Sequence, residues 1–305
     1  MRLVFAGTPA AAVPTLHRLA REHEILAVVT RPDAPLGRKR VLTASPVAQA
    51  AEELGLPVVK AARLDAEATA RISALRPELG VIVAYGGLVR EPLLSTPLHG
   101  WINLHFSLLP SWRGAAPVQR ALIAGDQTLG ASVFRLVPEL DAGDVFASRV
   151  VEVPGHATAD LALTTLAADG AELVADVVAG IAAGTARAVP QTGDATFAPK
   201  LSLDDGAIDW GQPLTRVFAR YRGVTPEPGA HTTVGGARLK ILEASPTEAP
   251  PLDPGELVAT KSALLIGTAT APLSVSRVQP SGKAAMNAVD WWRGQRGAEG
   301  LRAGS

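Results

Sequence analysis

Asn103, His105 and Asp141 are the residues of this sequence whose types and spacing could form a reaction centre. Asn103 and His105 lie two positions apart in the run Trp101–Phe106, whose alternating character predicts a short strand. On a strand this spacing places both side chains on one face. The segment that follows, Ser107–Pro117, contains prolines and a glycine that exclude a regular helix or strand. The carboxyl end of a strand, where the chain enters such a loop, is the usual place for a site in an open α/β sheet.

These three side chains suit the transfer of a carbonyl carbon. An amide can donate a hydrogen bond to a developing oxyanion, an imidazole can move a proton near neutral pH, and a carboxylate can fix the charge of the imidazole or relay a proton. The sequence offers no serine elbow, metal cluster or phosphate loop as a rival. The substrate must then supply the nucleophile, for example an amine, and we predict acyl or one-carbon group transfer. The alternative is that Asn103 and His105 are satisfied core polar groups and that Asp141 belongs to a turn.

The composition excludes several classes of protein. The 305 residues suffice for two domains, and 47% hydrophobic residues indicate a globular chain. The absence of cysteine excludes disulfides, a cysteine nucleophile and thiolate metal sites, and the six histidines lack zinc-type spacing, so we expect no metal. No apolar run approaches the roughly 20 residues that span a bilayer, and we expect a cytoplasmic protein without membrane contact. Because acidic and basic residues are equal at 29 each, a nucleic-acid partner would have to meet a local basic patch.

The first part of the chain alternates strand and helix patterns, which predicts an α/β fold with a Rossmann-like parallel sheet. Arg2–Ala6 and Glu24–Thr30 have the pattern of apolar strands around a helical segment, and Leu79–Tyr85 is a continuous apolar run typical of a central strand covered on both faces. The GxGxxG pattern is absent, and Arg31 follows the second strand where a dinucleotide site needs an acid. A nicotinamide cofactor is therefore not expected.

Two loops of this region could carry function. Arg31–Pro46 is long, contains three prolines and carries the basic triplet Arg38, Lys39 and Arg40. A loop of that length in a compact domain is usually functional or mobile, although a charged triplet alone more often lies on a solvated surface. The turn at Tyr85–Gly87 could let backbone groups approach a ligand closely.

The remainder of the sequence predicts a second domain. A long helix over Thr158–Ile181 closes the first domain, and the Gly-, Thr-, Pro- and Gln-rich stretch after it indicates a linker. The predicted domains are residues 1–185 and 204–305, with the linker at 186–203. Five short strands in the last domain predict a small OB-like β-barrel, a frequent nucleic-acid platform: His231–Val234, Arg238–Leu242, Glu256–Thr260, Ala263–Ile266 and Leu273–Val278.

The segments NLHFSLLP, WRGAAPVQRA and LDAGD resemble the formyltransferases that use 10-formyltetrahydrofolate. Further segments narrow the resemblance to the members that formylate methionyl-tRNA: AGTP near the start, the loop PDAPLGRKR, and IDW and QPSGKAAM in the last third. The resemblance runs from about residue 2 to about residue 293. It implies a Rossmann-like formyltransferase domain followed by a tRNA-contacting OB-like domain, and transfer of the formyl group to the α-amino group of initiator methionyl-tRNA for translation initiation.

The resemblance also implies roles for individual residues. Asn103 would hold the formyl oxygen, His105 would stabilise the oxyanion and pass a proton, and Asp141 would keep His105 charged and take the proton of the attacking amine. Phe106 departs from many relatives, which have a small residue there, so its ring either narrows the folate pocket or packs beneath it. The folate co-substrate would contact a run after this strand and a turn after the central strand: Ser107, Leu108, Leu109 and Pro110, and Tyr85, Gly86, Gly87 and Leu88.

The basic loop corresponds to the segment of the family that meets the acceptor stem of the tRNA, with Arg38, Lys39 and Arg40 as its contacts. We expect a monomer. Two other functions fit part of the pattern. A folate-dependent formyltransferase acting on an amino sugar or a ribonucleotide would share the three catalytic residues but would be expected to lack the basic loop or carry another C-terminal half. A tRNA-binding module with an inactive catalytic domain is the second, and the intact trio argues against it.

Overall fold

The structure is a computed structural model, and it describes residues 1–37, 40–295 and 300–305. The chain divides into two compact units, each assembled from segments that are separate in the sequence. Among the helices of the described chain, none combines the length and the apolar composition that crossing a bilayer requires. The first unit consists of Met1–Pro117, Thr128–Glu152 and Leu163–Ala198, and the second of Val118–Gln127, Val153–Ala162 and Pro199–Ser305.

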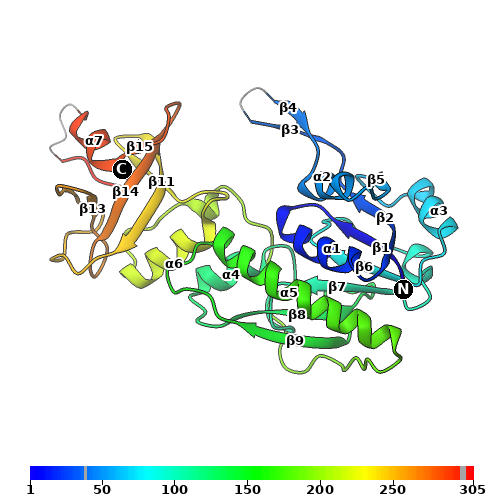
Figure 1. Cartoon of the computed structure of the whole chain (residues 1–305). Coiled ribbons are helices and arrows are strands. Elements are labelled where there is room, and N and C mark those ends of the chain that lie inside the picture. Colours follow the sequence, from blue (N-terminus) through cyan, green and yellow to red (C-terminus); the bar gives the residue numbers. More distant parts are fainter. Residues whose placement is uncertain (38–39, 296–299) are drawn as a thin grey trace. The chain divides into compact units, whose positions relative to one another are not determined.

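The first unit is built on a seven-stranded sheet with the strand order β5-β2-β1-β6-β7-β8-β9 (Figure 1). The strands from β5 to β7 are parallel, which confirms the α/β prediction. β8 and β9 run antiparallel to their neighbours, a feature that the sequence pattern did not predict. A loop without a helix joins β8 to β9, and such a short connection suits only an antiparallel pair. The strands are β1 (Arg2–Gly7), β2 (Glu24–Thr30), β5 (Val58–Lys60), β6 (Leu79–Val83), β7 (Trp101–His105), β8 (Leu129–Arg135) and β9 (Val145–Val151).

Two helices of this unit begin at side-chain caps. Ser45 precedes α2 (Pro46–Glu53), and its Oγ accepts a hydrogen bond at 3.0 Å from a first-turn amide. Asp65 precedes α3 (Ala66–Ala74), and its Oδ1 does the same at 3.0 Å. Each cap satisfies one of the amides that a helix start leaves without a partner. The other helices are α1 (Val13–Ala20) and, each with residues in both units, α4 (Pro117–Ala124) and α5 (Ala159–Ala182).

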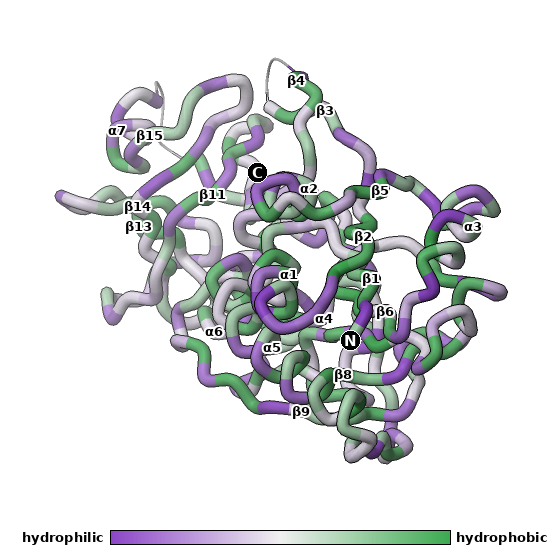
Figure 2. Tube along the Cα trace, turned by 45° about the vertical axis from the view of Figure 1, so that its right-hand side comes forward, coloured by the Kyte–Doolittle hydropathy of each residue, from purple (hydrophilic) through white to green (hydrophobic). Residues whose placement is uncertain are grey.

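Close packing holds the strands that lead to the site. β6 is buried along its whole length, as its continuous apolar sequence predicts. Its neighbour β7 begins with Trp101, whose ring is 1% exposed and whose Nε1 donates to the carbonyl of Leu93 at 2.8 Å. Gly80 on β6 makes room for this ring, because a Cβ there would lie 2.1 Å from it. Figure 2 shows the hydrophobic colour along much of β2, another strand of the same sheet.

The loop predicted over residues 31–46 contains structure that the sequence did not reveal. β3 (Ala34–Leu36) and β4 (Val41–Thr43) pair as a short antiparallel ribbon. Arg40 lies between them with a φ of 50° and is exposed. Arg38 and Lys39 lie outside the described residues.

The second unit contains an antiparallel sheet with the order β10-β11-β14-β13-β12, and β15 pairs with β14. This sheet confirms the β domain predicted for the C-terminal region, and its core includes Trp210 and Trp291. Two helices were not predicted, α6 (Leu214–Val224) and α7 (Ala288–Arg293). The strands are β10 (His231–Val234), β11 (Ala237–Pro246), β12 (Leu257–Ala259), β13 (Leu264–Ile266), β14 (Leu273–Pro280) and β15 (Met286–Asn287).

Candidate active site

β7 delivers Asn103 and His105 to one face of the sheet through their two-residue spacing. His105 is the last residue of the strand and is 6% exposed, whereas Asn103 is half-buried. The chain then turns back through Ser107–Pro110, and the carbonyl of Trp112 accepts a hydrogen bond from His105 Nε2 at 2.8 Å. The loop that follows the strand therefore holds the imidazole from its far side.

This hydrogen bond defines the tautomer of His105. A carbonyl oxygen can only accept, so Nε2 carries the proton and the neutral ring presents the lone pair of Nδ1. Burial lowers the pKa of His105 below its ordinary value, while the carboxylate of Asp141 and the carbonyl of Trp112 raise it by less. Asp141 thus acts on the imidazole in the direction that the resemblance implies, yet the buried ring is neutral near pH 7.

Asp141 faces Nδ1 from the loop between β8 and β9. Its Oδ2 is 3.8 Å from His105 Nδ1, and the two side chains are 12% and 7% exposed. The same oxygen accepts a hydrogen bond from the amide of Gly114 at 2.8 Å. Gly114 has a φ of 125°, and a Cβ there would lie 2.7 Å from the carbonyl of Ala198, so this approach requires glycine. The structure brings the imidazole and the carboxylate together across 36 positions of sequence.

Asn103 adds an unpartnered acceptor on the face of β7 that carries His105. Its Oδ1 is buried, and within the described part of the chain it has no hydrogen-bond partner. Most buried polar atoms in native proteins are bonded, so an exception points to a ligand or to a strained site. Phe134 lies opposite Asn103 on β8 and sets its ring edge-on to His105, with the ring centres 6.3 Å apart. The polar groups therefore meet in largely apolar surroundings, where a hydrogen bond is stronger than in water.

Hydroxyl groups hold the run Ser107–Pro110. Ser132 Oγ donates to the carbonyl of Ser107 at 2.8 Å and lies 3.1 Å from the amide of Leu109, which donates to it. Ser107 Oγ donates in turn to the carbonyl of Ser111 at 2.6 Å. The ring of Phe106 is 7% exposed, so it packs in the interior of the unit.

A cavity of about 640 Å³ borders the turn that follows β6. Its lining combines part of this turn with three arginines: Gly86, Gly87 and Leu88, and Arg31, Arg63 and Arg90. Guanidinium groups suit carboxylates and phosphates, which they can bind through two parallel hydrogen bonds. The described residues contain no group of three or more His, Asp and Glu side chains that could hold a metal ion.

Tyr85, predicted with the same turn, faces the core instead. Its ring is 1% exposed, and its hydroxyl donates to the carbonyl of Ala61 at 3.0 Å. Burial raises the pKa of Tyr85. Only the main chain of this residue can meet a ligand, and its carbonyl already accepts a hydrogen bond from Thr8 Oγ1 at 3.1 Å.

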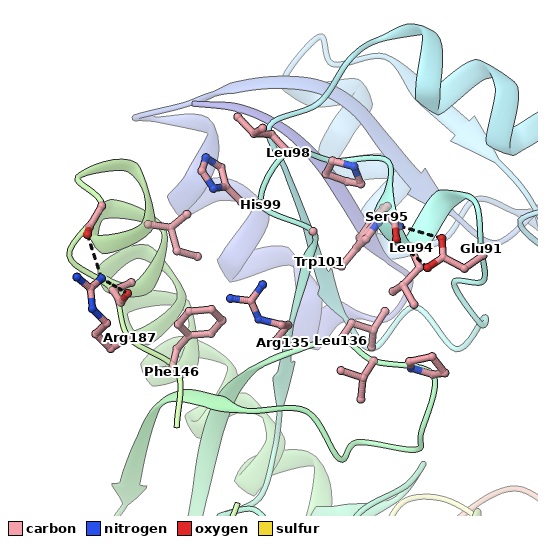
Figure 3. Close-up of a pocket in the computed structure, with 17 residues that line it drawn as sticks. Glu91, Leu94, Ser95, Leu98, His99, Trp101, Arg135, Leu136, Phe146 and Arg187 are labelled. Atoms are coloured by element: carbon pink, nitrogen blue, oxygen red, sulfur yellow. Dashed lines mark hydrogen bonds between the residues drawn. The ribbon is translucent and has the colours of Figure 1, made fainter. Parts of the chain in front are cut away.

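A second cavity, of about 580 Å³, lies at the opposite end of β7 (Figure 3). Trp101, Arg135 and Phe146 help to line it, and the guanidinium carbon of Arg135 lies 5.4 Å from the centre of the Phe146 ring. Figure 3 also shows Glu91 bonded to Ser95, whose amide and hydroxyl both donate to the carboxylate. The lining of this second cavity includes none of the residues predicted for catalysis or folate binding.

Two side chains that support the Asp141 loop were not selected from the sequence. Gln191 Nε2 donates to the carbonyls of Asp141 and Gly143 at 2.8 and 2.9 Å. Its Oε1 accepts from Arg113 Nε at 3.2 Å and from Arg113 Nη2 at 2.6 Å. Gln191 lies in the stretch predicted to be a linker, 50 positions from Asp141, so no local pattern could have placed it here. Arg113 could have been noticed, because it belongs to the WRGAAP segment.

Known proteins are similar to this chain in sequence and in fold. Residues 1–178 match the family model described as formyl transferase, and residues 200–296 match the model of the formyl transferase C-terminal domain. The chain belongs to the formyl transferase family. The methionyl-tRNA formyltransferase of Clavibacter sepedonicus is 60% identical to this formyl transferase over 296 residues, which cover 96% of this chain and 97% of that protein.

Solved structures share the formyl transferase fold at much lower identity. A HypX variant from Aquifex aeolicus has a TM-score of 0.70 at 18% identity over 97% of this chain; this chain spans about half the length of that protein, 48%. WlaRD, a sugar 3N-formyl transferase solved in the presence of dTDP and 5-N-formyl-THF, has a TM-score of 0.70 at 12% identity, covering 93% of this chain and 99% of that one. Proteins of this fold include one named for methionyl-tRNA and one named for a sugar, so the fold alone does not identify the acceptor.

Proposed function

We propose that this formyl transferase moves the formyl group of 10-formyltetrahydrofolate to the α-amino group of initiator methionyl-tRNA, giving N-formylmethionyl-tRNA for translation initiation. The observation that carries the proposal is the pair His105 and Asp141, 3.8 Å apart at the carboxyl end of β7, the strand that also carries the unpartnered oxygen of Asn103. The choice of methionyl-tRNA rests on the 60% identity to a protein of that name.

Neutral His105 serves as the proton carrier. The amine nitrogen attacks the formyl carbon, and the carbonyl electron pair moves to oxygen, giving a tetrahedral intermediate. His105 Nδ1 accepts a proton from this nitrogen, and the charge of Asp141 stabilises the imidazolium because the two groups are close and poorly hydrated. The bond from the formyl carbon to folate N10 then breaks, its electron pair stays on N10, and N10 takes the proton from the imidazolium as the carbonyl forms again.

Asn103 orients the reacting groups. Its amide nitrogen can donate to the formyl oxygen and so stabilise the oxyanion. Its unpartnered Oδ1 can accept a hydrogen bond from the attacking amine. An amide that contacts both reactants brings nitrogen and carbon together before bond formation, which converts binding energy into rate.

The folate is assigned to the run Ser107, Leu108, Leu109 and Pro110 and to the turn Tyr85, Gly86, Gly87 and Leu88. The cavity beside Gly86 supports this assignment, because its arginines suit the carboxylates of the glutamyl end of a folate. Tyr85 would contribute through its main chain alone, since its ring is in the core.

The tRNA is assigned to Arg38, Lys39 and Arg40 and to the C-terminal domain, residues 204–305. A basic triplet binds phosphates by releasing counterions, so tRNA binding is expected to weaken as salt is raised. The predicted domain limits, the linker at 186–203, a monomeric chain and a cytoplasmic location remain part of this proposal.

One assay separates the three functions considered. The protein is incubated with 10-formyltetrahydrofolate and either charged initiator tRNA or a nucleotide-linked amino sugar, and formylated product is measured. We expect formyl-methionine on the tRNA, formed far more slowly by a His105→Ala variant. Product from the amino sugar alone would show that the acceptor is an amino sugar and not methionyl-tRNA. Binding of tRNA without any formylated product would favour a tRNA-binding module with an inactive catalytic domain.

A further inference from the structure

The loop that carries Asp141 adopts a conformation that needs outside support. Asp141 has a φ of 46°, a left-handed region that few residues other than glycine occupy. A Cβ at Gly143 would lie 1.8 Å from the carbonyl of Arg135, so the chain there passes very close to the end of β8. Strained backbone of this kind persists only where the surrounding structure over-determines it.

Gln191 supplies that support from a distant segment. Its single amide nitrogen donates to the carbonyl of Asp141 and to the carbonyl of Gly143, so its two hydrogens span the turn that presents the carboxylate. Its oxygen is held by two donors of Arg113. Every polar group of the Gln191 amide is therefore used, which restricts the side chain to one orientation.

The hydrogen bonds between Gln191 and Arg113 also connect Gln191 with the loop that binds Nε2 of His105. Arg113 lies between Trp112, whose carbonyl binds His105 Nε2, and Gly114, whose amide binds Asp141 Oδ2. The main chain of Arg113 is itself tied to the segment after Gln191, because Arg113 N donates to the carbonyl of Thr196 at 2.9 Å. Asp141, Gln191, Arg113 and Gly114 thus form a closed circuit of hydrogen bonds and main chain, and His105 is joined to it through the carbonyl of Trp112.

We propose that Gln191 is a positioning residue that sets the carboxylate of Asp141 against Nδ1 of His105. The part of this inference that concerns turnover rests on the proposed formyl transfer; the part that concerns geometry does not. A purely structural role for Gln191 would change stability alone, whereas a positioning role changes the behaviour of the imidazole in the folded protein.

The first experiment uses Gln191→Met, which keeps the length of the side chain but removes both donors and the acceptor. Gln127→Met is the matched control, because Gln127 Nε2 also donates to a main-chain carbonyl, that of Gly125, at 2.9 Å. We expect kcat for formyl transfer to fall on the order of 10- to 100-fold in Gln191→Met, the loss typical of a reacting group displaced by about 1 Å. KM for both substrates should stay as in the wild type, and the fall in kcat is counted per folded molecule, because the carbonyls of Asp141 and Gly143 lose their partner and the melting temperature falls.

A second measurement needs no substrate: the titration of His105 in the free protein, followed by NMR. In the described chain the groups that act on this ring are the carboxylate of Asp141, the carbonyl of Trp112 and the apolar surroundings. Asp141→Asn removes the charge and should move the titration to lower pH; Gln191→Met should move it in the same direction by a smaller amount. An unchanged titration in Gln191→Met, beside a shifted one in Asp141→Asn, overturns the inference. A shifted titration in a protein that formylates nothing supports the positioning role and overturns the proposed function instead.

Gln191→Glu keeps the test decisive if the methionine variant does not fold. A glutamate retains the acceptor for Arg113 but, when ionised, cannot donate to the two carbonyls. It should lose turnover as Gln191→Met does, and Gln191→Asn, which keeps the amide, should recover part of it. Turnover equal to the wild type in Gln191→Glu would contradict the proposal.

Discussion

The two ends of β7 differ in how their polar groups are satisfied. At the amino end Trp101 is 1% exposed, and its one donor is bonded to the carbonyl of Leu93. At the carboxyl end Asn103 Oδ1 is buried without a partner, and burial lowers the pKa of His105. Both ends of the sheet carry a cavity, of about 580 and about 640 Å³. Cavity size therefore does not distinguish the two ends. The unpartnered oxygen of Asn103 does, because it can accept a hydrogen bond from a ligand.

The largest expected effect is on catalysis at the carboxyl end. Replacing His105 by Ala removes the proton carrier and should lower kcat by roughly 10²- to 10⁴-fold. His99 lines the cavity at the amino end, so His99→Ala is the matched control and should leave kcat unchanged. Steady-state formylation of methionyl-tRNA measures both. Near-normal turnover in His105→Ala, or an equal loss in His99→Ala, would remove the distinction between the two ends.

Trp101→Ala should lower the stability of the protein and leave its catalysis unchanged, the reverse of what we expect for His105→Ala. It leaves a cavity over Gly80 of β6 and an unbonded carbonyl at Leu93, and we expect a loss of about 3–5 kcal/mol in the free energy of unfolding. Urea denaturation gives this value, and kcat per folded molecule should be kept. A large fall in kcat with unchanged stability would mean that the amino end takes part in the reaction.

Asn103→Leu should lower activity without lowering stability. Loss of the amide should lower kcat by roughly 10²- to 10³-fold, the usual cost of one oxyanion donor. Stability should stay equal or rise, because an apolar group of similar shape replaces a buried acceptor that has no partner. Chemical denaturation and kinetics are compared in the same preparation. A clear loss of stability would show that Oδ1 is bonded in the folded protein.

The pH dependence of stability should also report on the carboxyl end. The pKa of His105 is lowered in the folded state, so between that pKa and about 6.5 the unfolded chain binds more protons and stability rises with pH. The contribution of neutral His105 to the free energy of unfolding is complete above the pKa of the unfolded chain. It is lost as the pH falls from that pKa towards the lower pKa of the folded state. We expect the wild type to lose more stability than His105→Gln between pH 7.5 and 5, measured by urea unfolding. His23, whose pKa is lowered mainly by burial, should leave a similar dependence in that variant, and a His23→Gln, His105→Gln double variant should reduce it further.

The smallest effect is expected at the cavity of the amino end. Arg135 lies over the ring of Phe146 on an exposed part of β8, so Arg135→Ala should change the free energy of unfolding by no more than about 0.5–1 kcal/mol. Formylation should not change. Thermal denaturation and the kinetic assay check both statements, and a marked loss of activity would show that this cavity belongs to the site.

The fold was predictable where patterns are local. The strand predicted at Glu24–Thr30 matches β2, and the apolar runs of the C-terminal region match strands of the second sheet. The helix α6 was missed although Leu214, Val217, Phe218 and Tyr221 form a stripe of helical spacing. The ribbon of β3 and β4 was missed because its strands are short and one contains a proline, so they carry little periodic signal.

The sequence by itself determined which residues can react and that Asn103 and His105 share a face, because side-chain chemistry and strand periodicity are local properties. Only the tertiary structure decided the tautomer of His105, the approach of Asp141 to its ring and the contact of Gln191 with the Asp141 loop. The amide that binds Asp141 is 27 positions from it and Gln191 is 50 positions from it. Such meetings depend on the packing of a whole sheet and its loops, so no short segment of sequence contains them.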